Sequence, residues 1–188
     1  MSEQISAILK GKLDGLSTYG FAITDPKIRL NALKEELQFY VLDFIYHHPE
    51  YNKWIMYGGS ALRICYDLDR MSVDLDFEVN HKIDDDFLNE LKKEVGEHFS
   101  KVYSVDSEFL RITITNNRGL TLKFKVGSLI DGSEWVHVKV DLNIFIPSSN
   151  VVTERIPQNH GQLSFVIRTY NLSSLMASKI AAIFLRLP

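Results

Sequence analysis

The stretch Tyr-Gly-Gly-Ser-Ala-Leu-Arg at residues 57–63 follows a short apolar run that begins at Trp54. Aromatic and β-preferring residues that stop at two glycines are typical of a strand ending in a tight turn. Ser60 then opens a predicted helix as its N-cap, and Gly58 and Gly59 let backbone N–H groups approach a ligand. Such a turn suits a phosphate, although many strand-to-helix turns use the same residues for geometry alone.

A second segment, residues 73–79, alternates apolar and acidic side chains. This period of two predicts a strand with one buried face, which leaves Asp74 and Asp76 together on the other face. Their Cα atoms are then roughly 6.6 Å apart, so both carboxylates can reach one or two cations. An exposed edge strand would show the same alternation. The nearby Asp67 and Asp69 lack the pattern and are predicted to be solvated connector residues.

A third acid, Asp141, lies within residues 135–146, which alternate along their whole length. One face of this predicted strand is aliphatic throughout, and Asp141 points away from it. If the two acid-bearing strands are neighbours, two charges ~5 Å apart repel by about 3 kcal/mol at an effective dielectric of 20. A divalent cation would relieve that repulsion, and all-oxygen ligation favours Mg²⁺ or Mn²⁺ over zinc.

These motifs, together with Tyr66, Arg70 and Ser72 between them, resemble the AbiEii/AbiGii toxin family of the DNA polymerase β-like nucleotidyltransferase superfamily. The resemblance extends to residues 171–182, which look like the family's helix with its lysine, here Lys179. Ser178 stands where the family often has an acid before that lysine.

The resemblance implies a metal-dependent nucleotidyltransferase. Gly59 and Ser60 would hold the triphosphate of an NTP, with Lys179 as a further phosphate contact. Asp74 and Asp76 would bind Mg²⁺ or Mn²⁺, and Asp141 would complete the metal site and orient or deprotonate an acceptor hydroxyl. The acceptor would be an RNA end or a protein side chain, and an antitoxin protein would be a partner, in a toxin–antitoxin or phage-defence setting.

Two rival functions stay open at this point. A non-catalytic module would bind nucleotide or a partner protein without turnover, and an antibiotic-modifying enzyme would transfer the nucleotide to a small molecule. Both share the nucleotide site, so only the acceptor and turnover distinguish them.

Composition is that of a globular chain: 188 residues, 45% hydrophobic and 24% charged. The net charge of −3 argues against a broad nucleic-acid surface. The single cysteine, Cys65, fits a reducing compartment. Without an apolar run of membrane-spanning length or a signal sequence, we expect a soluble, cytoplasmic protein with no membrane partner.

The expected fold is α+β, with a twisted mixed or antiparallel sheet that carries the three acids on one face and is packed by helices on the other. Helices are predicted over residues 4–16, from Asp25-Pro26 to about His48, and from the acid run at residues 84–86, which is expected to start a helix rather than bind metal. Residues 110–126 are predicted to form a hairpin. Residues 151–170 are expected to be mixed loop and strand.

We expect one catalytic core over residues 1–188, with helices in 1–50, the sheet and its motifs in 51–150, and the start of a C-terminal helical part in 171–188. Asn171 is the predicted cap of the last helix, whose apolar residues are expected to form a core stripe that runs to Leu187 without a stop signal. Further helices follow in the resembling family. The chain is therefore expected to be cut from a longer protein or completed by a partner or second copy, with Ile183, Phe184 and Leu187 exposed or covered by another chain.

Overall fold

The structure, a computed structural model, describes residues 3–16, 25–126, 129, 134–145 and 151–184. These residues form a seven-stranded sheet with strand order β3-β4-β5-β2-β1-β7-β6. The strands are β1 Ile55–Tyr57, β2 Asp74–Val79, β3 Leu110–Thr115, β4 Gly119–Lys125, β5 Trp135–Ile144, β6 Thr153–His160 and β7 Leu163–Tyr170. The helices are α1 Glu3–Gly15, α2 Pro26–His47, α3 Gly58–Tyr66, α4 Asp85–Tyr103 and α5 Leu172–Phe184.

The sheet is mixed, as predicted. The pairs β2·β5 and β1·β7 are parallel, and the remaining pairs are antiparallel. The two acid-bearing strands, β2 and β5, are therefore direct neighbours in the middle of the sheet. Their aliphatic faces favour this position, because apolar side chains bury most surface on a strand that has neighbours on both sides.

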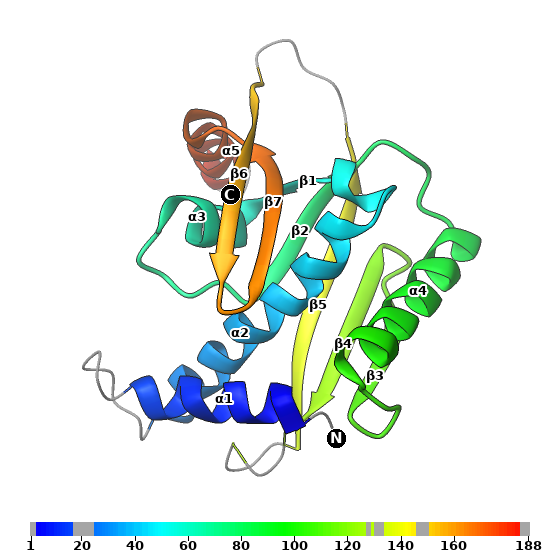
Figure 1. Ribbon diagram of the computed structural model, residues 1–188. Helices are drawn as coiled ribbons and strands as arrows, with labels where there is room; N and C mark the ends of the chain where they lie inside the picture. Colours follow the sequence, from blue (N-terminus) through cyan, green and yellow to red (C-terminus); the bar gives the residue numbers. More distant parts are fainter. Residues whose placement is uncertain (1–2, 17–24, 127–128, 130–133, 146–150, 185–188) are drawn as a thin grey trace.

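The apolar face of the sheet is covered by α2 and α4, with α1 along one end (Figure 1). Leu75 and Phe77 of β2 and Val138 and Leu142 of β5 are completely buried beneath these helices. Helices α3 and α5 instead approach the acid-bearing side near β1 and β2. One face of the sheet therefore packs against the core, and the other face carries Asp74, Asp76 and Asp141.

Two predicted helix starts are confirmed. Asp25 caps α2 by accepting a hydrogen bond from the Lys27 N–H, and Pro26 occupies the first turn. Asp84 caps α4 by accepting from the Phe87 N–H. The acid run at residues 84–86 therefore serves a helix terminus, as expected from the helix dipole.

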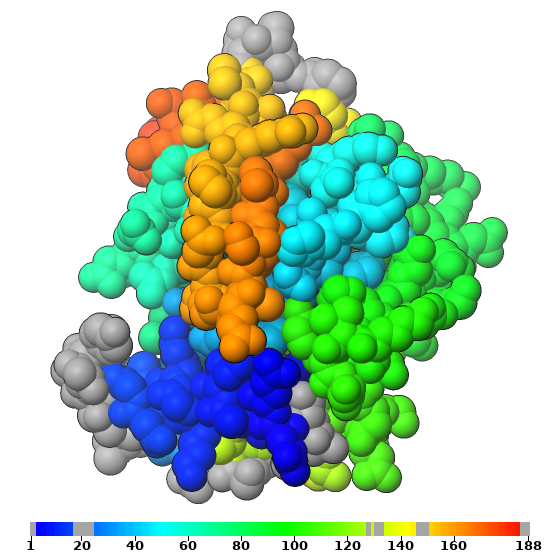
Figure 2. All heavy atoms as spheres, viewed as in Figure 1, coloured from blue at the N-terminus to red at the C-terminus, as the bar shows by residue number. Residues whose placement is uncertain are grey.

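The segment expected to be mixed loop and strand is a regular hairpin, β6–β7, turned at Gly161 with a φ of +59°. Strand β7 joins the sheet by pairing with β1. Figure 2 shows the hairpin lying against α2 on the face turned to the viewer. There the His160 ring stacks on Phe39 with ring centroids 3.6 Å apart. The edge strand β6 is polar and contains Pro157, which hides the alternation that marks a strand.

Helix α5 begins as predicted, with the Asn171 side chain accepting from the Ser174 N–H. The prediction that its apolar residues form a core stripe is wrong for the described part: Leu175 is buried, but Ile180, Ile183 and Phe184 are 52%, 62% and 70% exposed. The exposure expected of Ile183 and Phe184 is therefore confirmed, whereas Leu187 lies outside the described residues. The end of the predicted strand at Ile146 also lies outside them.

Within the described ranges, none of the helices combines the length and the apolar character needed to cross a membrane.

Candidate active site

The glycine turn leads from β1 directly into α3. The helix begins at Gly58, three residues earlier than an N-cap at Ser60 predicts, because the φ of +77° at Gly58 lets the chain reverse at once after the strand. The prediction that Ser60 caps the helix is therefore wrong. Ser60 is buried in the first turn, where its hydroxyl donates to the backbone carbonyl of Asp74 and lies 3.0 Å from the Ser72 hydroxyl.

Both glycines pack directly against the residues that follow. A Cβ added at Gly58 would lie 2.5 Å from Oδ2 of Asp76, and one added at Gly59 would lie 2.7 Å from the Ser72 hydroxyl oxygen. At these distances the side chain of Asp76 or Ser72 would have to shift to make room for a Cβ. The turn thus brings backbone N–H groups at the start of a helix close to the acids of β2.

The three acids come together through strand register. In the parallel pair β2·β5, Asp76 is the partner of Asp141, and Asp74 lies two residues before Asp76 on the same face. Neighbouring strands are about 4.8 Å apart, so Asp76 and Asp141 are side by side. The prediction that Asp141 occupies a strand next to that of Asp74 and Asp76 is confirmed.

The site is electrostatically crowded. The pKa of Asp76 is raised from 3.8 to about 6, first by burial and then by the charges of Asp141 and Asp74, while Lys179 acts in the opposite direction. A buried carboxylate beside two others is costly to ionise. The acids therefore form a region of concentrated negative charge that a cation would stabilise.

Lys179 reaches this region from α5. Its ammonium nitrogen lies 3.9 Å from the position that a Cβ on Gly59 would occupy, and its charge is felt by Asp76. A lysine on a helix is usually a solvated surface residue. Here the fold places it over the glycine turn, although the two are separated by most of the chain.

A cavity of about 420 Å³ opens between α3, the start of β2 and α5. Its volume is in the range of small-molecule sites. The lining residues are Gly59, Leu62, Leu68, Arg70, Met71, Ser72, Val73, Asp74, Asp76, Met176 and Lys179. Of the predicted site residues, Gly58, Ser60 and Asp141 do not line it. Asp141 is the strand partner of Asp76, which does line it.

The donor set fits a hard divalent cation in part. All available ligands are carboxylate oxygens, as Mg²⁺ and Mn²⁺ prefer. Across the described ranges, however, no three His, Cys, Asp or Glu side chains are gathered closely enough to hold a metal between them. Mg²⁺ is usually bound by one or two carboxylates together with substrate phosphates. The acids are thus suited to a metal that arrives with a phosphate ligand.

Two further polar pairs extend the acid face, and sequence reasoning assigned them no role. The Asn143 amide donates to the Tyr57 hydroxyl over 2.7 Å, and the Tyr170 hydroxyl donates to Glu78. Burial and the charges of Asp76 and Glu78 raise the pKa of Tyr57 to about 12. The alternating pattern of the two strands could have indicated these residues, since Asn143 lies on the same strand face as Asp141 and Glu78 on the same face as Asp76.

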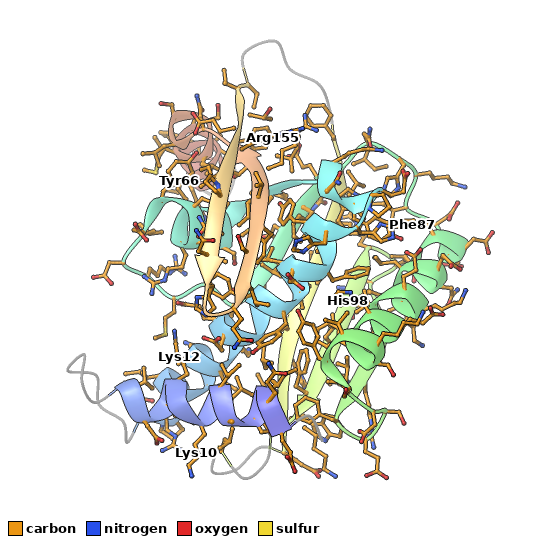
Figure 3. The ribbon with its side chains drawn as sticks, in the orientation of Figure 1. Lys10, Lys12, Tyr66, Phe87, His98 and Arg155 are labelled. Carbon is orange, nitrogen blue, oxygen red and sulfur yellow. The ribbon has the colours of Figure 1, made fainter. Side chains whose placement is uncertain are left out.

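Tyr66, which belongs to the recognised motif, anchors α3 to the β6–β7 hairpin. Its hydroxyl lies 2.9 Å from the carbonyl oxygen of Tyr170 and 3.0 Å from Oε2 of Glu154. Figure 3 shows Tyr66 beside the hairpin. Its place in the motif is therefore structural.

Comparison of the sequence with protein-family models identifies the family of this chain. The sequence model of the AbiEii family, described as nucleotidyl transferase AbiEii toxin of type IV toxin–antitoxin systems, matches residues 41–187, which is well over half of the chain. A comparison with curated proteins found no match.

Two solved structures align with this chain, and only the alignment of the first is good enough to compare folds. MenT4, a nucleotidyltransferase toxin from Mycobacterium tuberculosis, is 17% identical and aligns with a TM-score of 0.55 over 94% of this chain. JHP933 from Helicobacter pylori is 15% identical, with a TM-score of 0.47 over 81% of this chain. The chain spans 58% of the length of MenT4 and 56% of that of JHP933. The likeness to MenT4 shows the α+β fold.

Proposed function

The chain belongs to the AbiEii family of nucleotidyltransferase toxins, and from this premise we propose that it transfers a nucleoside monophosphate from an NTP to an acceptor hydroxyl. The observation that carries the proposal is the pairing of Asp76 with Asp141 on adjacent strands, next to a glycine turn that packs closely against Asp76 and Ser72. A strand face that gathers acids against a helix N-terminus suits a substrate that combines phosphates with a metal ion.

The triphosphate is held by the turn and by α5. Backbone N–H groups of Gly58, Gly59 and Ser60 face it from the first turn of α3, where the helix dipole favours negative charge. Lys179 adds a cation, since its ammonium nitrogen lies 3.9 Å from the position that a Cβ on Gly59 would occupy. The Ser60 hydroxyl is occupied by the Asp74 carbonyl, so Ser60 contributes its N–H group and fixes the backbone next to Asp74.

With substrate phosphates completing the ligand set, Asp74, Asp76 and Asp141 are the residues that would hold Mg²⁺ or Mn²⁺. When bound, such ions neutralise charge on the α-phosphate and on the leaving pyrophosphate. Asp141 does not line the cavity but is the strand partner of Asp76, which does, and from there it would orient the acceptor hydroxyl or accept its proton. The P–O bond to pyrophosphate breaks as the acceptor oxygen bonds to the α-phosphorus.

The acceptor is an RNA end or a protein side chain, and an antitoxin protein is the expected partner of a chain of this family. The acid face extends past Asp76 and Asp141 to Tyr57 and Asn143, which offers polar contacts beyond the nucleotide.

The test is transfer of label from α-labelled NTPs in the presence of Mg²⁺, with RNA, protein and small-molecule acceptors supplied separately. Asp76→Asn and Asp141→Asn should each reduce labelling at least a hundredfold, because the cation would lose a charged ligand. Asp86→Asn is the matched control, since Asp86 is an exposed acid in the first turn of α4. Labelled small molecules alone would favour the antibiotic-modifying alternative. Metal-dependent NTP binding without any transfer would favour a non-catalytic module.

A further inference from the structure

The segment between α3 and β2, residues 67–73, forms one wall of the candidate NTP cavity and is called the connector below. Arg70, Met71 and Ser72 of the connector line that cavity. Residues 67–70 are exposed, and residues 71–73 are only half-buried. Since dispersion contacts need close packing on all sides, the connector gains little positional restraint from packing.

The connector also borders a second cavity of about 630 Å³. Arg70 and Met71 line this cavity as well, and α1, α2 and α3 form its other walls. The connector thus borders two open spaces. A wall of this kind can move into the space behind it unless hydrogen bonds hold it.

Helix α3 provides such bonds at both ends of the connector. At the end next to β2, Ser60 is bonded to Ser72 and to the Asp74 carbonyl. At the end next to α3, the Leu68 carbonyl accepts from a guanidinium N–H of Arg63 over 3.1 Å, while the Leu68 N–H donates to the Leu62 carbonyl over 3.1 Å. Arg63 therefore provides the side-chain tether at the start of the wall.

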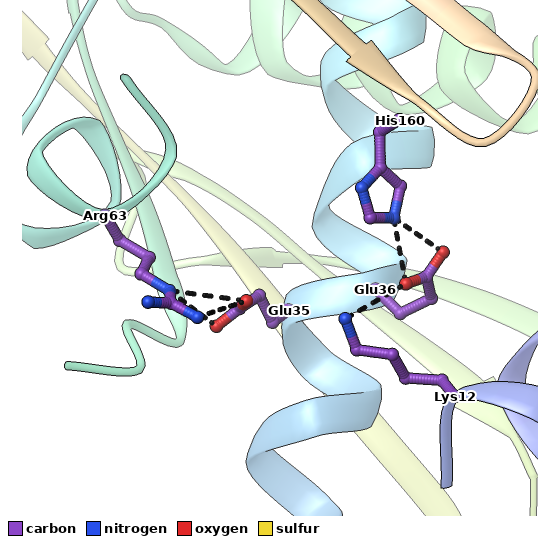
Figure 4. A network of polar contacts seen from close by, with 5 residues as sticks. All are labelled: Lys12, Glu35, Glu36, Arg63 and His160. Carbon is purple, nitrogen blue, oxygen red and sulfur yellow. Dashed lines mark hydrogen bonds and ion pairs between the residues drawn. The ribbon is translucent and has the colours of Figure 1, made fainter. Parts of the chain in front are cut away.

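The direction of the Arg63 side chain is set by Glu35 on α2. Three nitrogen–oxygen contacts of 3.1–3.4 Å join the guanidinium to the carboxylate, as Figure 4 shows. Glu35 is only 8% exposed, and removing the partner of a buried carboxylate is destabilising, so the contact with Arg63 is well fixed. The planar guanidinium can serve Glu35 and the Leu68 carbonyl at the same time because its donors point in several fixed directions.

We propose that Arg63, oriented by Glu35, is a positioning residue that holds the connector as a wall of the NTP cavity. This inference rests on the proposed function of that cavity. Loss of Arg63 would free the wall, so it should weaken NTP binding and raise KM for the NTP. Because Arg63 does not line the NTP cavity, kcat should stay nearly unchanged.

The structure offers a matched control on the next residue of α2. Glu36 is 5% exposed and pairs with His160 at 2.9 Å and with Lys12 at 3.7 Å, which join it to the β6–β7 hairpin and to α1 (Figure 4). This pairing has no contact with the connector. His160→Gln therefore changes a comparable contact to a buried carboxylate of α2 without releasing the wall.

The experiment compares wild type, Arg63→Met, Arg63→Lys and His160→Gln by two measurements. The first is hydrogen exchange of the backbone amides in residues 68–73, and the second is the affinity for Mg²⁺ with an NTP, together with KM and kcat. Arg63→Met should speed exchange and weaken NTP binding each about tenfold, the size expected for one lost hydrogen bond to a charged group. His160→Gln should change neither, although it lowers the melting temperature.

Arg63→Lys keeps the charge beside Glu35 but loses the planar set of donors, so it should melt close to wild type and still show fast exchange in the connector. This variant decides the matter if Arg63→Met fails to fold. Unchanged exchange in both Arg63 variants, or fast exchange with unchanged NTP affinity, would overturn the proposal. A wild-type protein that binds no NTP would instead remove the proposed function, and the exchange measurement would still decide whether Arg63 holds the connector.

Discussion

At Gly58 the backbone φ is +77°, and the missing side chain leaves the space that Asp76 occupies. Gly58→Ala and Gly161→Ala should each lose about 1 kcal/mol of stability, because both residues have a positive φ. Only at Gly58 would the new methyl group strike a carboxylate oxygen, so Asp76 must rotate away. Urea unfolding together with Mg²⁺-dependent NTP binding checks this. Equal NTP binding by the two variants would contradict the claim that Gly58 makes room for Asp76.

The raised pKa of Asp76 has a consequence for stability. With a folded-state pKa of about 6 against an ordinary value of 3.8, the folded chain holds this proton more tightly than the unfolded chain. Stability should therefore fall as pH rises from about 4 to about 6, and the ionised group remains unfavourable above that window. In buffer without divalent cations, Asp76→Asn should be more stable than wild type at pH 8 by about 1 kcal/mol, after a discount for solvent screening.

The same comparison at pH 4 is the control for Asp76→Asn. There the folded wild-type carboxyl is protonated and the unfolded one is only about half ionised, so most of the difference in unfolding free energy should be lost. A constant difference at pH 4 and pH 8 would mean that packing, and not charge, separates the two proteins.

Among the elements, β2 and β5 were predictable from sequence and the β6–β7 hairpin was not. Asp74, Asp76 and Asp141 alternate with aliphatic residues, and one buried face is enough to fix which way each side chain points. The hairpin has a polar edge strand interrupted by Pro157, so its pairing depends on the tertiary fold and not on a local sequence pattern.

Lys179 could be assigned only by family resemblance, because helical periodicity does not indicate which distant turn a lysine side chain will reach.

Helix α5 shows where periodicity misleads. Its apolar stripe predicts a buried face, yet the described chain covers only Leu175. Leu175→Ala should cost about 2–5 kcal/mol, as for other buried leucines. Ile180→Ala, at a position that is 52% exposed, should cost no more than about 0.5 kcal/mol. Denaturant unfolding of the two variants checks this, and an equal cost would mean that the exposed face is covered in solution.

In the molecule as a whole, the strand order brings residues from three parts of the chain to one place. The glycine turn follows β1, two acids lie on β2, and the third lies on β5, with β2 between its two partners. Because β7 pairs with β1, helix α5 starts close to the glycine turn, and Lys179 of α5 lies near Gly59. The register of Asp76 with Asp141 is therefore the feature on which the proposed chemistry most depends.

The most direct test of that chemistry is a crystal structure of the chain with Mn²⁺ and a non-hydrolysable NTP, in which anomalous scattering locates the metal. We expect Mn²⁺ within about 2–2.5 Å of carboxylate oxygens of Asp74 or Asp76 and of a phosphate oxygen, with the triphosphate against Gly59 and Lys179. An NTP bound in the cavity of about 630 Å³ instead, or a metal in contact with none of Asp74, Asp76 and Asp141, would contradict the account.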